Sequence, residues 1–175
     1  MAPRASLSVQ SHLIEFMPIL EENLKKAHFI STVRNPKDTF VSWYALSQAA
    51  SLVMGRWKLP PFTSVTAHMG FWESFTNAEM KFFVKEKNST KCKGSKTVVT
   101  FKSYIKNQEE TVRTLYKNMG LKVSKEYSAA LKEDAERHEN YKANRGYDNP
   151  SLEDLGTCAE VVEDKLEEYI DTFKI

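Results

Sequence analysis

Apolar side chains recur at the spacing of an amphipathic helix in several stretches of this chain. Residues 13–24 form the first stretch, and Pro18 within it predicts a short helix that begins or breaks there. Residues 65–83 carry a stripe of aromatic side chains, which predicts a long helix with that stripe in the core. Further apolar periodicity predicts a helix that closes at Gly120 and another that opens at Ser124. The C-terminal half is therefore expected to be rich in helices.

Two shorter stretches, residues 28–33 and 97–101, are apolar and rich in β-branched side chains, which predicts strands. Because helices separate them in the sequence, the two strands predict a parallel sheet. Asn35 suits a helix cap and Pro36 suits the first helical position, so a helix is expected from here to about Leu52. Together these elements predict an α/β fold with few strands.

A final helix is predicted after Thr157, which forms a capping box with Glu160, and its apolar positions extend to Phe173. Residues 55–61 are predicted to form a loop because they contain glycine and proline. The chain has no internal repeat and no linker rich in Pro, Gly or Ser. We therefore expect residues 1–175 to form a single domain.

Composition and charge exclude several classes of protein. Apolar residues make up 41% of the chain and charged residues 27%, which is ordinary for a globular protein and unlike a disordered or fibrous one. The formal charge of +2, from 25 Lys and Arg against 23 Asp and Glu, gives no argument for a nucleic-acid partner. Cys92 and Cys158 lack the spacing of a disulfide framework or a zinc site, so no metal is expected. Because no secretory signal and no apolar stretch of ~20 residues is found, we expect a cytoplasmic protein without a membrane partner.

Arg34 lies at a position where α/β proteins commonly bind ligands. It follows the first predicted strand and precedes a helix start, and open α/β sheets bind anionic ligands at such positions. A guanidinium can hold a phosphate by two parallel hydrogen bonds, and Ser42, two turns along the helix, projects back toward the helix start. Arg34 and Ser42 therefore predict a binding site for one terminal phosphate.

The eleven residues from position 34 to 44, RNPKDTFVSWY, resemble the 3′-phosphate-binding segment of the cytosolic sulfotransferase family. The resemblance implies that Arg34 and Ser42 contact the 3′-phosphate of the donor 3′-phosphoadenosine 5′-phosphosulfate (PAPS). It also implies a P-loop-like three-layer fold with a short parallel sheet, and a small-molecule acceptor that receives a sulfuryl group on a hydroxyl or amine. Residues 98–104 and the helix that ends near Gly120 are similar to later parts of the family, so the resemblance covers most of the chain.

Ser11-His12-Leu13 is similar to the family's Ser/Thr-His-Leu element, in which the histidine is the general base toward the acceptor hydroxyl. The resemblance therefore makes His12 the catalytic candidate. An imidazole with an ordinary pKa near ~6.5 suits proton removal at neutral pH. The competing interpretation is a solvated histidine near the N-terminus.

The chain departs from the family pattern in two places. The family begins with a strand and a Lys-Ser-Gly-Thr-Thr-Trp-like loop around the 5′-phosphosulfate, and no such element precedes His12. The late Arg-Lys-Gly motif has only a distant counterpart at Arg145 and Gly146. Residues 93–97 have the composition of a phosphate loop but precede a strand, whereas a phosphate loop follows one. We therefore expect a partial sulfotransferase-like domain that is truncated at its N-terminus and helix-rich in its C-terminal half.

Two functional hypotheses remain open at this point. The chain is either a sulfotransferase that uses His12, Arg34 and Ser42, or a truncated, non-catalytic relative that binds the nucleotide 3′-phosphate or a partner protein. The identity of the acceptor and the oligomeric state, including a homodimer, stay open on the sequence alone.

Overall fold

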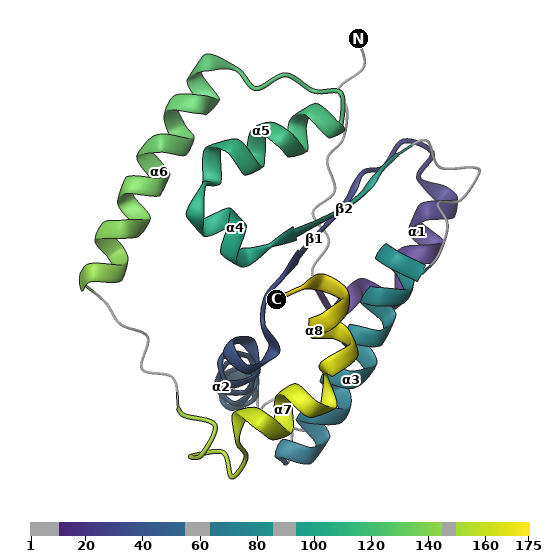
Figure 1. Cartoon of the computed structure of the whole chain (residues 1–175), viewed down its shortest axis with the longest axis vertical. Helices are drawn as coiled ribbons and strands as arrows, with labels where there is room; N and C mark the ends of the chain where they lie inside the picture. The colour runs from purple at the N-terminus through teal and green to yellow at the C-terminus, as the bar shows by residue number, and fades with distance from the viewer. Residues whose placement is uncertain (1–10, 55–63, 86–93, 145–149) are drawn as a thin grey trace. The chain divides into compact units, whose positions relative to one another are not determined.

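The computed structural model describes residues 11–54, 64–85, 94–144 and 150–175, and it is a mixed α/β structure in which helices predominate (Figure 1). The elements, in chain order, are η1 (Ser11–Phe16), α1 (Met17–Asn23), β1 (Phe29–Val33), α2 (Pro36–Met54), α3 (Val65–Met80), η3 (Lys81–Lys85), β2 (Lys96–Thr100), α4 (Phe101–Lys106), α5 (Gln108–Asn118), α6 (Lys125–Asn144), α7 (Ala159–Lys165) and α8 (Glu167–Phe173). The predicted α/β class and the helical C-terminal half are confirmed. The predicted loop at residues 55–61 lies outside the described residues.

Strands β1 and β2 pair in parallel, as predicted, with Phe29 opposite Lys96 and Val33 opposite Thr100. The second strand begins and ends one residue earlier than predicted. It ends at Thr100 because this residue is the N-cap of α4. Its hydroxyl accepts a hydrogen bond from the backbone N–H of Ser103 at 3.3 Å, so the helix begins at Phe101.

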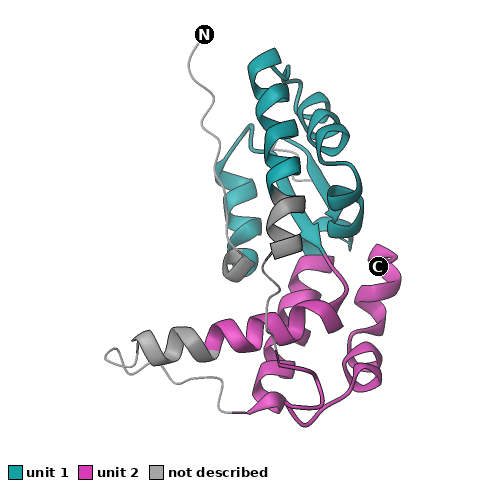
Figure 2. Cartoon of the chain, turned by 90° about the vertical axis from the view of Figure 1, so that its left-hand side faces the viewer, with its two compact units in different colours: residues 1–33, 81–146 teal, residues 34–80, 147–175 magenta. Residues whose placement is uncertain are grey.

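The chain divides into two compact units, which Figure 2 shows in different colours. Unit 1 consists of Met1–Val33 and Lys81–Gly146, and it contains the sheet together with η1, α1, η3, α4, α5 and α6. Phe29 of β1 meets Phe82 of η3 edge to face, with ring centroids 5.2 Å apart. The predicted helix ends are confirmed here, since Gly120 adopts a φ of 67° after α5 and the Ser124 hydroxyl accepts from the Tyr127 N–H at 3.1 Å.

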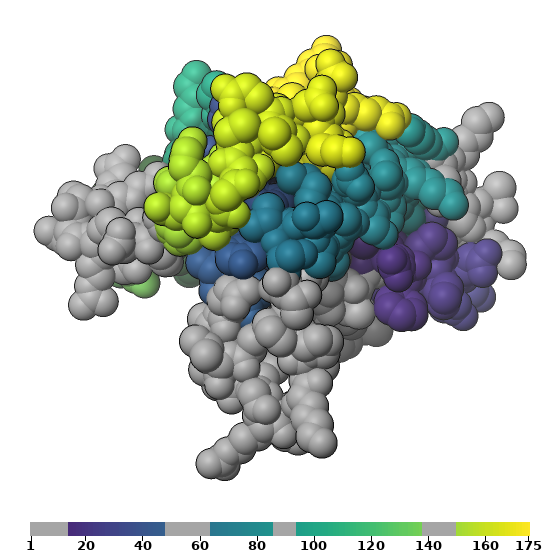
Figure 3. Space-filling view, turned by 90° about the horizontal axis from the view of Figure 1, so that it is seen from below, coloured from purple at the N-terminus to yellow at the C-terminus, as the bar shows by residue number. Residues whose placement is uncertain are grey.

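Unit 2 consists of Arg34–Met80 and Tyr147–Ile175, and it packs α2, α3, α7 and α8 around a core of its own. The buried members of this core are Phe40, Met69, Trp72, Val162 and Leu166. The predicted aromatic stripe of α3 is thus in the core at Trp72, while Phe75 is half-buried against it. In the space-filling view of Figure 3 the C-terminal segment lies over α3, consistent with the contact between α3 and α8.

The prediction of one final helix with a capping box at Thr157 is wrong in two respects. The N-cap residue of α7 is Cys158, one position later than predicted, and it makes no side-chain cap hydrogen bond. The backbone N–H of Thr157 is bound to the Leu152 carbonyl at 3.0 Å. The helix is also divided at Leu166, whose φ of −117° interrupts it and whose side chain is only 3% exposed. Burial of Leu166 therefore accompanies the turn between α7 and α8.

The predicted helix over residues 13–24 is present as η1, a 3₁₀-helix, followed by α1, which carries Pro18 in its first turn, as the sequence predicted. The predicted helix over residues 65–83 is α3 extended by the π-helical turn η3. In the ranges that the structure covers, no helix combines the length and the apolar character needed to span a bilayer.

Candidate functional site

The junction between β1 and α2 is built as the sequence predicts. The side-chain oxygen of Asn35 accepts a hydrogen bond from the backbone N–H of Lys37 at 3.0 Å, and its carbonyl accepts from Asp38 at 3.1 Å. Pro36 occupies the first position of α2 and is fully buried. The cap and the buried proline fix the direction in which the chain leaves Arg34.

Helix α2 has one buried side and one exposed side. Phe40 is 0% exposed in the unit 2 core, whereas Arg34, Asp38 and Ser42 are all exposed. Positions four apart lie on one helix face and advance by about 6 Å along the axis. Arg34 and Asp38 confirm this arrangement, since the Arg34 Nε lies 3.5 Å from the Asp38 Oδ2. Asp38 and Ser42 therefore lie on one exposed face of α2, and Arg34, two residues before the helix, contacts Asp38 at its start.

This arrangement has a direct consequence for any anion held by Arg34 and Ser42. The Asp38 carboxylate lies between them in the helical sequence, and it already contacts the Arg34 guanidinium. A strong charge-assisted N–H···O hydrogen bond measures about 2.7–2.9 Å, so the 3.5 Å contact is a loose ion pair. An incoming phosphate must displace or share this contact. The binding role of Arg34 and Ser42 stays a prediction.

The surroundings of Arg34 are not positive. The Lys37 Nζ lies 2.8 Å from Glu163 on α7, and this hydrogen-bonded partner raises the pKa of Lys37. The pKa of Glu160, in the first turn of α7, is lowered chiefly by a hydrogen bond to its own backbone. The charged side chains at this end of unit 2 comprise two cations and three carboxylates, a net charge of −1: Arg34, Lys37, Asp38, Glu160 and Glu163. We therefore expect an anion to bind here through direct contacts with Arg34 rather than through the summed electrostatic field of the surrounding side chains.

The structure does not describe the side chains of the other residues predicted for the site. His12 belongs to η1 in unit 1, and its side chain lies outside the part of the chain that the structure describes. Arg145 and Gly146, the distant counterparts of the late motif, also lie outside the described residues. The general-base role of His12 therefore stays a prediction.

A buried histidine beneath α2 was missed by the sequence reasoning. His68 is 0% exposed, and its Nε2 lies 3.1 Å from the Phe40 carbonyl oxygen and 3.2 Å from the Trp72 indole nitrogen. The tautomer with a hydrogen on Nε2 donates to Phe40, and the other tautomer accepts from Trp72. Burial lowers the pKa of His68, so the imidazole is neutral. His68 thus joins α3 to the turn of α2 that precedes Ser42. The sequence does contain an indication that His68 is buried. It lies four positions before Trp72, on the helix face that the apolar stripe predicts to be in the core.

A second buried polar contact joins α8 to α3. The Tyr169 hydroxyl donates to Glu79 Oε2 at 2.7 Å, and both residues are 3% exposed. Burial, reinforced by the Glu79 carboxylate, raises the pKa of Tyr169, so the phenol stays protonated and remains a donor. This contact joins α8 to α3 within unit 2.

The segment with phosphate-loop composition precedes a strand, as predicted. Ser95 lies immediately before β2, where its hydroxyl is 2.9 Å from the His28 Nδ1. The backbone N–H of Ser95 donates to the same nitrogen at 3.3 Å. Gly94 passes so close to the Ala27 carbonyl that a Cβ at this position would overlap it. Gly94 and Ser95 are therefore explained by the close approach of this segment to residues 27 and 28.

Comparison with known proteins gives one match. A family model described as a sulfotransferase domain matches residues 3–153, which is most of the chain. No curated protein matches the chain. No solved structure matches it either.

Proposed function

Because this chain belongs to the sulfotransferase family, we propose that it binds PAPS and that Arg34 and Ser42 hold the 3′-phosphate of this donor. The observation that carries the proposal is the exposed face at the capped start of α2, where a guanidinium and a hydroxyl follow each other two turns apart. The segment resembles the family's 3′-phosphate-binding segment over eleven residues. A small-molecule acceptor and a cytoplasmic location are part of the same proposal.

The residues at this face suit a phosphate monoester. The guanidinium of Arg34 offers two parallel N–H donors, and the hydroxyl of Ser42 offers one more. The Asp38 carboxylate accepts from Arg34 through a long contact, which a doubly charged phosphate replaces by shorter, stronger hydrogen bonds. Because the neighbouring charged side chains named above, one lysine and three carboxylates, sum to −2 without Arg34, loss of the Arg34 contacts is expected to remove most of the affinity for the 3′-phosphate.

The proposed reaction uses His12 as the base. As the acceptor oxygen or nitrogen forms its bond to sulfur, His12 takes the proton, and the bond from sulfur to the donor's phosphate oxygen breaks. Adenosine 3′,5′-bisphosphate leaves with the electron pair of that bond. A neutral imidazole with an ordinary pKa is suited to this step near pH 7. No Lys-Ser-Gly-Thr-Thr-Trp-like stretch occurs within these 175 residues, so the second candidate function is nucleotide binding without transfer.

Calorimetric titration with adenosine 3′,5′-bisphosphate tests the role of Arg34. Arg34→Ala should weaken binding by about 10- to 150-fold, which corresponds to the 1.5–3 kcal/mol of a hydrogen bond to a charged group. Adenosine 5′-monophosphate lacks the 3′-phosphate, so its affinity should be unchanged by the same substitution. Arg137→Ala is the matched control, because Arg137 is also an exposed arginine paired with an acidic residue four positions away, at 3.1 Å.

Equal affinity of Arg34→Ala and the wild type for the bisphosphate would contradict the proposed site. A sulfate-transfer assay with labelled donor and a mixed panel of phenols, alcohols and amines then separates the two functions. His12→Ala should lower any observed transfer by about 10²-fold or more. Tight bisphosphate binding with no transfer to any acceptor would favour the non-catalytic alternative.

A further inference from the structure

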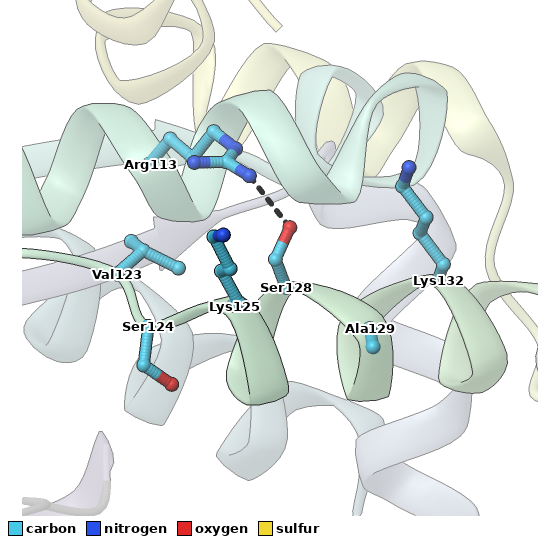
Figure 4. Close-up of a pocket in the computed structure, with 7 residues that line it drawn as sticks. All are labelled: Arg113, Val123, Ser124, Lys125, Ser128, Ala129 and Lys132. Carbon is cyan, nitrogen blue, oxygen red and sulfur yellow. Dashed lines mark hydrogen bonds between the residues drawn. The ribbon is translucent and has the colours of Figure 1, made fainter.

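Helices α5 and α6 of unit 1 enclose a cavity that no part of the proposed function uses. Its volume is about 300 Å³. Arg113 of α5 and Lys125, Ser128 and Lys132 of α6 line it, together with apolar surface from neighbouring side chains (Figure 4). Figure 4 shows Lys125 and Ser128 pointing from α6 toward Arg113. Three cations from two helices therefore converge on one small concavity.

The cations exceed the acidic charge at this cavity. One carboxylate, Glu109, contacts them: it lies 2.8 Å from the Arg113 guanidinium and 3.9 Å from the Lys132 Nζ. Hydrogen bonds from Ser128 and Arg113 lower the pKa of Glu109, so this carboxylate is charged at neutral pH. The carboxylate of Glu126 is likewise bound to a lining residue, Ser124, so the three cations stand against two carboxylates among the described residues, a net charge of +1. At the start of α2, in contrast, the corresponding balance is −1.

Two of the lining side chains, Arg113 and Ser128, are joined by hydrogen bonds. Arg113 donates to the Ser128 hydroxyl at 2.6 Å, and Ser128 in turn donates to Glu109 at 2.7 Å. This triangle joins α5 to α6. Lys125 and Lys132 are seven positions apart, which places them on one face of α6 about two turns from each other. The carboxylate of Glu126 is hydrogen bonded to Ser124, a lining residue just before α6, as the carboxylate of Glu109 is to Ser128.

We propose that the cavity between α5 and α6 binds a tetrahedral dianion, namely a phosphate or sulfate group. Its several oxygens can accept from the three lining cations, which outnumber the neighbouring carboxylates Glu109 and Glu126. The volume of about 300 Å³ is at the lower limit for small-molecule pockets, so the ligand is a free ion or a small ester. Val123 and Ala129 provide the apolar surface that the organic part of an ester would cover.

Nuclear magnetic resonance titration of the full chain tests this proposal, with sodium phosphate, sodium sulfate and phenyl phosphate as ligands at constant ionic strength. Sodium chloride is the reference titration. Saturable shifts are expected for the amides of α5 and α6 with the dianions and not with chloride. The double variant Lys125→Ala/Lys132→Ala should weaken binding by about tenfold, since each exposed charge contact contributes up to about fivefold. Both lysines are exposed, so the variant should keep the circular dichroism spectrum of the wild type.

The control variant Lys102→Ala/Lys106→Ala removes the same charge from exposed positions on α4 and should leave the affinity unchanged. Arg34→Ala should also leave it unchanged, which separates this site from the proposed donor site. Tighter binding of phenyl phosphate than of inorganic phosphate identifies an ester as the ligand, and equal binding identifies the free ion. Shifts that do not saturate, equal weakening in both double variants, or loss of binding in Arg34→Ala would each overturn the proposal.

Discussion

The buried ion pair between Lys96 and Glu21 offers a prediction whose size follows from its geometry. The Lys96 Nζ lies 3.1 Å from the Glu21 Oε2, and the two side chains are only 6% and 7% exposed. The same ammonium donates to the Phe82 carbonyl at 2.9 Å and lies 3.8 Å from the centre of the Phe82 ring. One side chain on β2 therefore connects the sheet to both α1 and η3.

Lys96→Ala removes the ammonium that compensates a buried carboxylate. Breaking a buried pair in this way costs about 3–5 kcal/mol, because the remaining charge stays in a site of low dielectric constant. A small domain has a total stability of about 5–15 kcal/mol, so this loss is a large part of it. Lys96→Met/Glu21→Met removes both charges and keeps the volume, and such replacements are often close to neutral. We therefore expect most of the lost stability to return in the double variant.

Urea unfolding followed by circular dichroism measures these free energies. Arg137→Ala serves as the exposed counterpart, because its pair with Glu133 has side chains 68% and 74% exposed and should contribute less than about 1 kcal/mol. A loss below about 1 kcal/mol in Lys96→Ala would show that water reaches the pair. Equal destabilisation of the single and double variants would show that the lysine acts through packing and its contact with Phe82 instead.

Two further predictions concern unit 2 and the end of α5. Because burial lowers the pKa of His68, the unfolded chain binds a proton near pH ~6.5 that the folded chain does not, so stability should fall from pH 7 to pH 5. His68→Gln should show a smaller loss of melting temperature over that range, and an unchanged slope would contradict a buried neutral imidazole. Gly120→Ala should cost about 1 kcal/mol in urea unfolding, since the φ of 67° is unfavourable for a residue with a Cβ. Gly70→Ala, in the middle of α3 with no atom near the added Cβ, should not be destabilising.

The part of the fold that the sequence predicts well is controlled by neighbours in the chain. Asn35 and Pro36 fix the start of α2 through contacts within four residues, and Gly120 ends α5 through its own φ angle. The exposed face of Arg34 and Ser42 follows from the same helical periodicity. The candidate site was predictable because it depends on a cap, a helix and the spacing between two residues.

The polar contacts in the cores could not be predicted in this way. Tyr169 and Glu79 are 90 positions apart in the chain, and nothing local in either segment indicates the partner. Lys96 is equally ordinary in sequence, since a lysine before a β-branched stretch usually remains in water. The division of the final helix at Leu166 also accompanies burial that local sequence does not indicate, because Leu166 belongs to a core cluster with Phe40 of α2 and Trp72 of α3.

The division of the chain into two units bears on how binding and transfer are related. Arg34 and Ser42 both belong to unit 2. Phe40, which lies between Arg34 and Ser42 in the sequence, is in the core of that unit, and its carbonyl contacts His68. In the proposed function, the residues assigned to the 3′-phosphate belong to unit 2, and the assigned base, His12, belongs to unit 1. A substitution in the unit 2 core should therefore affect both activities, while one in the unit 1 core, such as Lys96→Ala, should reduce transfer more than it reduces binding of adenosine 3′,5′-bisphosphate.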